Sequence, residues 1–315
     1  MPNSTDTKHR LVFFGSSASS ALVLANLLAE PWLEVAAIVT QSPKDHAHTH
    51  QRVSGVAQLA QDNSIRLFTP SKLSEITDDL TQLQPTTGVL FAYGKILPDA
   101  TLDIFPKGIV NIHPSLLPKH RGPAPLEDTI LSGDKEAGTS IMLISSEMDA
   151  GPILAQKSFK IAADIPKQEL WEQLLEASRE LLIPTLRDYL ADSIAPHPQN
   201  ESLTPTYSQL IKKHDGDINP HAVSTAELTR RVRAYSGWPG TRLQVSVRGA
   251  TQSLTLHEVR ITDTQPAQAI KLSCENKQLL LHLTDGVVEI MRAQLPNKAI
   301  VTGQDICNAG PITLA

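Results

Sequence analysis

The sequence has few aromatic residues, two cysteines and no long apolar run. Aromatics make up 4% of its 315 residues, while a hydrophobic content of 41% supports sizeable cores and the length allows two domains. Cys274 and Cys307 form neither a metal-ligand spacing nor a disulfide framework, which fits a reducing cytoplasm. No segment is apolar for long enough to span a bilayer, and the polar N-terminus, MPNSTDTKHR, differs from a signal peptide. We therefore expect a cytoplasmic protein.

The net charge is also small, which argues against a chain built mainly to bind nucleic acid. It is −5 overall, with 16 basic against 24 acidic residues in 1–203 and 12 against 9 in 204–315. The second part, at +3, is far below the charge of a strong nucleic-acid binder, although it permits contact with a polyanion. Arg230, Arg231 and Arg233 lie close together there and predict either a solvated helix face or contacts to phosphate.

The first half of the chain has the alternating pattern of an α/β protein. Leu11–Phe14 is a short apolar strand pattern, Ser20–Leu28 has helical spacing and Val35–Val39 is a second strand pattern. A β-α-β opening predicts a parallel sheet with right-handed crossovers. The turn Gly15-Ser16-Ser17 lacks the G-x-G-x-x-G spacing, so a dinucleotide site is not expected. Further strands are predicted at residues 65–68, 88–92, 109–112, 139–144 and 153–159, and helices at 56–61, 124–131 and from 166 onward.

A change in composition divides the chain near residue 204. Residues 191–206, ADSIAPHPQNESLTPT, are rich in Pro, Ser, Asn and Gln, and we interpret them as a linker between domains at 1–190 and 207–315. Beyond it, Thr225–Tyr235 predicts a helix, and short alternating runs separated by Gly, Asn and Asp turns follow. Such runs are typical of a small β-barrel or an open β-sheet.

Three polar residues follow two neighbouring predicted strands. Asn111 and His113 are two residues apart at the end of one strand, so both side chains lie on the same face. Asp149 follows the next strand. An Asn amide can stabilise an oxyanion, His can move a proton near neutral pH, and Asp can orient the His or take a proton. A buried, hydrogen-bonded Asn and His with no catalytic role would show the same spacing.

Two other kinds of site are less well supported. The sequence lacks the G-x-S-x-G turn of many serine hydrolases, and Ser115 lies in an SLLP loop instead. The HAHTH run places His46, His48 and His50 in a polar loop, where such a spacing is more often a solvated stretch than a metal site. We therefore expect no metal.

The run from Gly108 to Pro125, GIVNIHPSLLPKHRGPAP, resembles the hallmark of the 10-formyltetrahydrofolate-dependent formyltransferases. In that family an Asn-x-His pair precedes an SLLP folate loop and an R-G-x-x-P segment. Further stretches are similar to the methionyl-tRNA formyltransferases at the corresponding places: FAYGKILP (91–98), EMDAGPIL (147–154), TYSQLIKKHDGDI (206–218), RRVRAYSGWPGT (230–241) and QLPNKAIVTGQDICN (294–308). The resemblance covers nearly the whole chain.

The resemblance implies a Rossmann-like catalytic domain followed by a small OB-like β-barrel that binds tRNA. It implies transfer of a formyl group from 10-formyltetrahydrofolate, without a metal, to the free amino group of initiator methionyl-tRNA in translation initiation. Asn111, His113 and Asp149 match the catalytic positions. The implied folate site consists of Phe91, Ala92, Tyr93, Ser115, Leu116, Leu117, Pro118, Met148 and Gly151. The implied tRNA contacts are Lys44, Arg52, Arg230, Arg231, Arg233 and Lys298.

Two stretches depart from the family's pattern. The turn after the first strand usually reads G-T-P-x-F-A, whereas residues 15–20 read GSSASS here. The next loop is typically rich in Gly, Arg and Lys and contacts the tRNA acceptor stem. Here Lys44 and Arg52 are its only fixed positive charges, so we expect a weaker grip on phosphate.

Two alternatives to this function stay open. A folate-dependent formyltransferase could act on an amino-sugar nucleotide, which the similarity of the C-terminal segments to tRNA formyltransferases disfavours. A tRNA-binding module without catalysis is disfavoured by the intact Asn-His-Asp set. We expect initiator methionyl-tRNA and folate as partners, no membrane association and a monomer.

Overall fold

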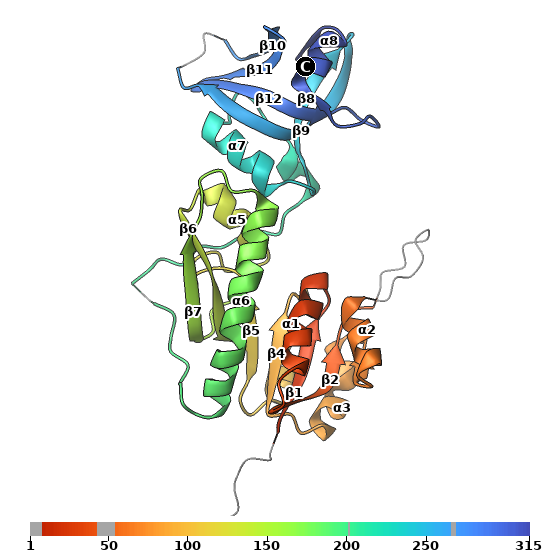
Figure 1. Cartoon of the computed structure of the whole chain (residues 1–315), viewed down its shortest axis with the longest axis vertical. Coiled ribbons are helices and arrows are strands. Elements are labelled where there is room, and N and C mark those ends of the chain that lie inside the picture. Colours follow the sequence, from red (N-terminus) through yellow and green to blue (C-terminus); the bar gives the residue numbers. More distant parts are fainter. Residues whose placement is uncertain (1–7, 43–53, 201, 266–268) are drawn as a thin grey trace, which may run out of the picture. The chain divides into compact units, whose positions relative to one another are not determined.

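The computed structural model describes residues 8–42, 54–200, 202–265 and 269–315, which form two units (Figure 1). The first unit contains the described residues up to Gly122 together with 137–159 and 172–207. The second contains 123–136, 160–171 and 208–315. The second unit therefore includes two short segments that interrupt the first unit in sequence, as well as the C-terminal residues.

A seven-stranded sheet forms the centre of the first unit. Its strands are β1 (His9–Gly15), β2 (Leu33–Val39), β3 (Arg66–Phe68), β4 (Thr87–Phe91), β5 (Ile109–His113), β6 (Glu136–Leu143) and β7 (Ile153–Lys160), in the order β3-β2-β1-β4-β5-β6-β7. Pairing is parallel from β3 to β5, which confirms the Rossmann-like prediction. β6 runs antiparallel to β5, so the sheet is mixed, with its parallel part from β3 to β5. The connection from β5 to β6, residues 114–135, contains one helix, α5 (Pro125–Ser132), but this helix belongs to the second unit and is not a crossover packed on this sheet, as parallel pairing usually has.

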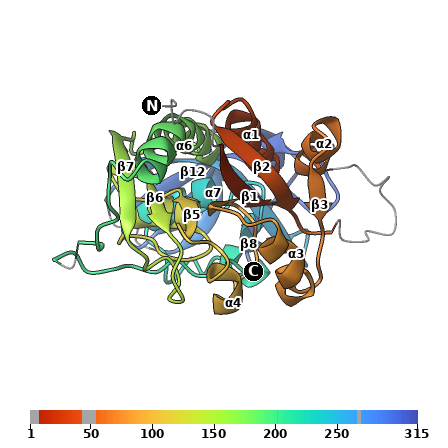
Figure 2. The same ribbon diagram turned by 90° about the horizontal axis from the view of Figure 1, so that it is seen from below.

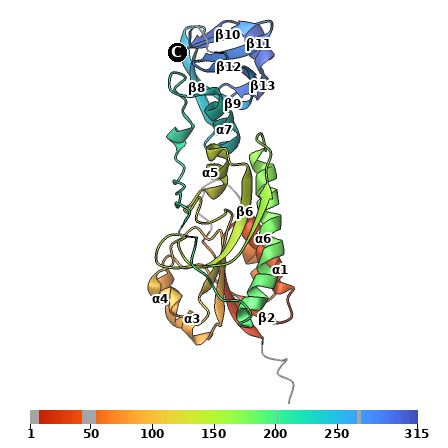
Figure 3. The same cartoon turned by 90° about the vertical axis from the view of Figure 1, so that its left-hand side faces the viewer.

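Helices cover both faces of this sheet because its strands are apolar on both sides. Figures 2 and 3 show α1 (Ala18–Leu28) and α6 (Lys167–Leu190) over one face, and α3 (Thr77–Gln82) and α4 (Asp99–Leu102) over the other. A further helix, α2 (Gly55–Asp62), packs beside α1. None of the described helices combines the length and the apolar character needed to cross a membrane.

The second unit contains an antiparallel barrel-like sheet. Its strands are β8 (Thr241–Val247), β9 (Ala250–Asp263), β10 (Lys271–Glu275), β11 (Gln278–Leu283), β12 (Gly286–Gln294), β13 (Val301–Thr302) and β14 (Ile312–Leu314), and its helices are α5 (Pro125–Ser132), α7 (Thr225–Ala234) and α8 (Gly303–Asn308). The order is β10-β11-β12-β9-β8-β14, with β13 beside β12, and the two ends of this order approach each other. Alternate residues such as Leu279, Leu281 and Leu283 fill the interior, as the sequence pattern predicts. The small OB-like barrel is confirmed.

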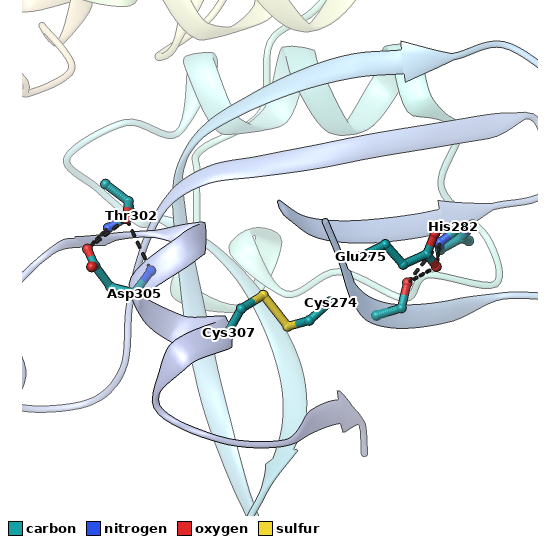
Figure 4. The surroundings of a disulfide bond; sticks show 7 residues. Cys274, Glu275, His282, Thr302, Asp305 and Cys307 are labelled. Atoms are coloured by element: carbon teal, nitrogen blue, oxygen red, sulfur yellow. Dashed lines mark hydrogen bonds and ion pairs between the residues drawn. A yellow bond between two sulfur atoms is a disulfide. The ribbon is translucent and has the colours of Figure 1, made fainter. Parts of the chain in front are cut away.

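A disulfide joins Cys274, at the end of β10, to Cys307 in α8 (Figure 4). The expectation that the two cysteines form no disulfide is therefore wrong, and the cysteine count carries no argument for a reducing compartment. The spacing of the cysteines in the sequence does not indicate this pairing, because it depends on the packing of α8 against β11 and β12. That packing brings residues 33 positions apart to a Cα–Cα distance of 5.7 Å. Thr302 caps the same helix through Asp305, so both ends of α8 are fixed.

Reduction of this disulfide should destabilise the second unit. A bond that closes a loop of 33 residues lowers the entropy of the unfolded chain, which corresponds to about 3–4 kcal/mol in the free energy of unfolding. When dithiothreitol is added, we expect the free energy of unfolding of the second unit to fall by that amount and its urea midpoint to move to a lower concentration. The matched control is Cys307→Ser, whose unfolding should resemble that of the reduced parent and be indifferent to dithiothreitol. Equal midpoints for the oxidised and reduced parent would show that the bond does not stabilise the fold.

Candidate active site

β5 places Asn111 and His113 on one face of the sheet. This strand pairs in parallel with β4 and antiparallel with β6, so its backbone is fixed on both sides. Only 9% of Asn111 and 4% of His113 is exposed. No hydrogen bond from within the described parts of the chain engages the Asn111 side-chain amide. That amide can therefore donate to a ligand without breaking an internal bond.

The His113 ring has a fixed orientation and a fixed tautomer. Its Nε2 lies 2.9 Å from the main-chain oxygen of His120. A carbonyl oxygen can only accept, so Nε2 carries the hydrogen and donates it. The neutral ring consequently has its lone pair on Nδ1, the nitrogen that can take a proton from a substrate.

Asp149 faces that lone pair. Its Oδ2 is 3.8 Å from His113 Nδ1, beyond hydrogen-bond distance, and accepts a hydrogen bond of 2.7 Å from the main-chain N–H of Gly122. Asp149 adopts a left-handed backbone conformation, with φ at +49°, in the loop between β6 and β7. The carboxylate and Nδ1 are thus two acceptors directed at the same space. A donor with more than one proton, such as an amine, can bond to both.

Burial sets the charge of His113. Removal from water lowers the pKa of His113 below its usual 6.5, and this is the largest effect. The negative charge of Asp149 and the hydrogen bond to the His120 carbonyl oppose it by raising the pKa, and the charge of the His120 ring lowers it again. The imidazole is therefore neutral at pH 7 and available as a base.

The loop after β5 is fixed by side chains of β6 and β7. Ser140 Oγ donates to the main-chain oxygen of Ser115 at 2.6 Å and accepts from the N–H of Leu117 at 3.1 Å. Gln156 Nε2 donates to Leu117 O at 2.9 Å and to Ser140 Oγ at 2.8 Å. Leu117 also packs on Met142. Four of the expected folate residues, 115–118, therefore belong to one rigid loop beside His113.

The unusual turn at residues 15–20 connects α1 to the end of β4. Ser17 caps the N-terminus of α1 through the backbone and side chain of Ser20. Ser20 Oγ in turn donates to the main-chain oxygen of Phe91 at 2.7 Å, and Ser16 N–H donates to Ala92 O at 3.3 Å. The serines that replace the family's usual residues thus hold the strand end at which three folate residues were expected.

The remaining folate candidates differ in what they expose. Tyr93 is 1% exposed, its ring lies edge-on to Phe14 in the core, and its main-chain oxygen accepts from Ser16 Oγ and Gln41 Nε2. Met148 is 54% exposed beside Asp149. A Cβ at Gly151 would lie 1.9 Å from the main-chain oxygen of Leu143, so no larger residue fits there without movement of the loop.

The expected tRNA contacts in the second unit are partly engaged in its own structure. All three arginines are on α7 and half-buried. Arg231 forms an ion pair of 2.7 Å with Glu227, and Arg233 donates to the main-chain oxygen of Ile165 at 3.1 Å. Burial lowers the pKa of Arg233 from its usual range, with Asp164 opposing the shift. Lys298 is exposed after β12.

The other expected contacts fall on the histidine-rich loop. Lys44 and Arg52, together with His46, His48 and His50, lie outside the described residues. Within the part of the chain that the structure does describe, no three His, Cys, Asp or Glu side chains are grouped so as to hold a metal ion.

Sequence reasoning missed three residues of the site. Gly122 supplies the N–H that holds Asp149, and Arg121 and Gln199 form a buried hydrogen-bonded pair next to it. Arg121 and Gly122 belong to the R-G-x-x-P segment, which was a usable signal. Gln199 lies in the segment interpreted as a linker and carried no signal.

Residues 9–186 match the formyl transferase family, and residues 210–310 match the formyl transferase C-terminal domain. A methionyl-tRNA formyltransferase of Roseiflexus castenholzii is 34% identical over 299 residues, 94% of each chain. The chain belongs to the methionyl-tRNA formyltransferase family.

Other methionyl-tRNA formyltransferases are similar over a comparable length. The protein of that name from Streptococcus pneumoniae strain CGSP14 is 32% identical over 294 residues, 92% of each chain. Among solved structures, an N-formyltransferase of Helicobacter canadensis in complex with folinic acid and dTDP-3-aminofucose superposes with a TM-score of 0.65. The alignment covers 91% of this chain and 99% of that one at 17% identity, which shows the shared fold.

Replacing Asp149 by Asn should lower the pKa of His113 further. The negative charge of Asp149 raises this pKa, so its removal leaves the effect of burial less opposed. The measurement is a pH titration of the His113 ring signals by NMR in the parent and in Asp149→Asn. As a control, Glu147→Gln removes an exposed charge from the same loop and should leave the titration unchanged. A raised or unaltered pKa in Asp149→Asn would contradict this arrangement of charges.

Proposed function

We propose that this chain transfers the formyl group of 10-formyltetrahydrofolate to the α-amino group of methionyl initiator tRNA. The family supports this, since both the catalytic and the C-terminal regions match and the relatives align over nearly their whole length. The observation that carries the proposal is the pair of acceptors, His113 Nδ1 and Asp149 Oδ2, that converge beside the free amide of Asn111. An amine that must lose a proton while it attacks a carbonyl group needs this combination.

The proposed reaction forms one carbon–nitrogen bond and breaks another. The amine nitrogen attacks the formyl carbon, and His113 Nδ1 takes the proton that the amine loses. The Asn111 amide donates to the formyl oxygen as negative charge develops on it. The protonated ring, stabilised by the charge of Asp149, returns the proton to the nitrogen that leaves the formyl carbon. Electrons and protons balance without a metal or an oxidant.

The residues near the trio suit a folate donor. Ser140 and Gln156 hold the main chain of the loop 115–118 in place, Ser16 and Ser20 hold that of residues 91–92, and exposed Met148 offers an apolar surface for a flat ring. We propose that Phe91, Ala92, Ser115, Leu116, Leu117, Pro118, Met148 and Gly151 line this site, with the backbone of Tyr93. We further propose that Arg230, Arg231, Arg233 and Lys298, together with Lys44 and Arg52, contact the tRNA.

The alternative acceptor is an amino-sugar nucleotide. The Helicobacter canadensis structure has an amino-sugar nucleotide bound, but its likeness to this chain extends only to the fold at 17% identity. Relatives with about twice that sequence identity, 34% and 32%, carry the name methionyl-tRNA formyltransferase. These findings favour the tRNA.

The direct test offers several amines to the purified chain. With 10-formyltetrahydrofolate present, we expect formylation of methionyl initiator tRNA and none of a panel of dTDP- and UDP-amino sugars. Product is followed by mass spectrometry of the aminoacyl group released from the tRNA and of the sugar nucleotides. Formylation of an amino sugar alone would replace the proposed acceptor, and formylation of neither would reject the proposal.

Removing any member of the catalytic trio should slow turnover strongly. Asn111→Ala, His113→Ala and Asp149→Asn each delete a group used mainly in the transition state, which contributes on the order of 3 kcal/mol. We expect kcat to fall by roughly two or more orders of magnitude in each, with circular dichroism unchanged. Ile112→Val is the matched control, because it changes the buried residue between the two on β5 whose side chain points to the opposite face. Parental turnover in any folded trio variant would remove that residue from the mechanism.

A further inference from the structure

The segment that follows α6 is attached to the catalytic loops of the first unit. His197 exchanges two main-chain hydrogen bonds with Ile153, at 2.8 and 2.9 Å. Arg121 N–H donates to Thr206 O at 2.9 Å, and Thr206 Oγ1 accepts from His120 N–H at 2.8 Å. The segment predicted from composition as a linker is therefore fixed at two points beside the site. Gln199 lies between these points and is buried, with 7% of its surface exposed.

The Gln199 side chain uses both ends of its amide. Nε2 donates to the main-chain oxygens of Asp149 at 2.7 Å and Gly151 at 3.0 Å. Oε1 accepts from Arg121 Nη2 at 2.7 Å and Nε at 3.1 Å. Because the two carbonyls need a donor and the guanidinium needs an acceptor, only one orientation of the amide satisfies all four bonds.

These bonds close a ring around the catalytic carboxylate. Arg121 precedes Gly122, whose N–H holds Asp149 Oδ2 at 2.7 Å. Gln199 joins the Arg121 side chain to the backbone of Asp149 itself. The carboxylate of Asp149 is thus tied to Gly122, and its backbone is tied through Gln199 to the neighbouring Arg121.

The backbone at Asp149 needs such support. A non-glycine residue with φ of +49° is in a sparsely populated conformation that persists only when its surroundings enforce it. Gly151 holds the next part of the loop against Leu143, and Gln199 bonds the carbonyls on either side of Ala150. Without these two bonds, the turn can relax and carry the carboxylate away from His113 Nδ1.

We propose that Gln199 is a positioning residue, which holds the backbone turn at Asp149 so that its carboxylate faces His113 Nδ1. The effect of Gln199 on turnover rests on the formyl transfer proposed above. Its effect on the His113–Asp149 pair is independent of that reaction and can be measured without substrate.

The first test is the titration of the His113 ring by NMR in Gln199→Met, which keeps the length of the side chain and removes both hydrogen-bonding ends. The charged groups that face this ring are Asp149 and His120. If the carboxylate moves away, the pKa of His113 should fall in Gln199→Met, in the direction expected for Asp149→Asn, and the double variant should show no lower a pKa than Asp149→Asn alone. An unchanged pKa in Gln199→Met overturns the proposal, whether or not the chain formylates tRNA.

The second test is a double-mutant cycle on kcat. Gln199→Met should lower kcat by about tenfold or more in the parent, since a displaced catalytic group loses much of its effect. In the Asp149→Asn background the same change should cost less than about threefold, because its target is already gone. Equal losses in both backgrounds would show that Gln199 supports only the fold. Should the parent prove inactive toward every amine, the proposed function fails and the titration alone decides the role of Gln199.

Two further variants separate this role from general stability. Gln199→Glu keeps the acceptor for Arg121 and loses the donor to Asp149 and Gly151, so its kcat should fall like that of Gln199→Met even if the latter folds poorly. Asn200→Leu is the matched control, since the side chain of this exposed neighbour accepts from Ser202, outside the ring of bonds around Asp149. It should leave kcat and the His113 titration unchanged. Parental kcat in Gln199→Glu would contradict the proposal.

Discussion

The hydrogen bond from His113 Nε2 to the main-chain oxygen of His120 is the interaction on which the site depends. It is made in a buried environment, where a carbonyl without a donor is costly. It fixes the ring and leaves the lone pair on Nδ1. Burial keeps the ring neutral, and the facing carboxylate stabilises the ring once it has taken a proton.

The backbone supplies much of the rest of the site. The N–H of Gly122 holds Asp149, the carbonyl of His120 holds His113, and Ser140 and Gln156 hold the main chain of the loop at 115–118. Main-chain groups are fixed by the sheet and by the segment after α6, so they lose little freedom when a ligand binds. Such a site is organised before substrate arrives, which is the condition for electrostatic stabilisation of a transition state.

Strand periodicity is a local property, so the shared face of Asn111 and His113, at alternate positions of an apolar strand, could be predicted from the sequence. The barrel was predictable for the same reason. Asp149 follows β6, which runs antiparallel to β5, so it reaches His113 through the loop between β6 and β7 and not through a shared strand end. The antiparallel direction of β6 was not predictable, since an apolar run indicates a buried strand but not its direction in the sheet.

The features that sequence reasoning missed are set by tertiary contacts. Gln199 belongs to a stretch whose Pro, Ser and Asn content is typical of linkers, yet its main chain pairs with the first unit. The Cys274–Cys307 bond depends on how α8 packs against the barrel. The GSSASS turn departs from the family's pattern, and only the structure shows its serines bonded to the end of β4.

The central claim is that His113 presents an unprotonated Nδ1 to the substrate, and ¹⁵N NMR of its ring tests this most directly. In protein labelled with ¹⁵N-histidine at pH 7, the account predicts a directly bonded proton on Nε2 of His113 and none on Nδ1. A proton on Nδ1, whether in the other neutral tautomer or in the imidazolium, would contradict the account.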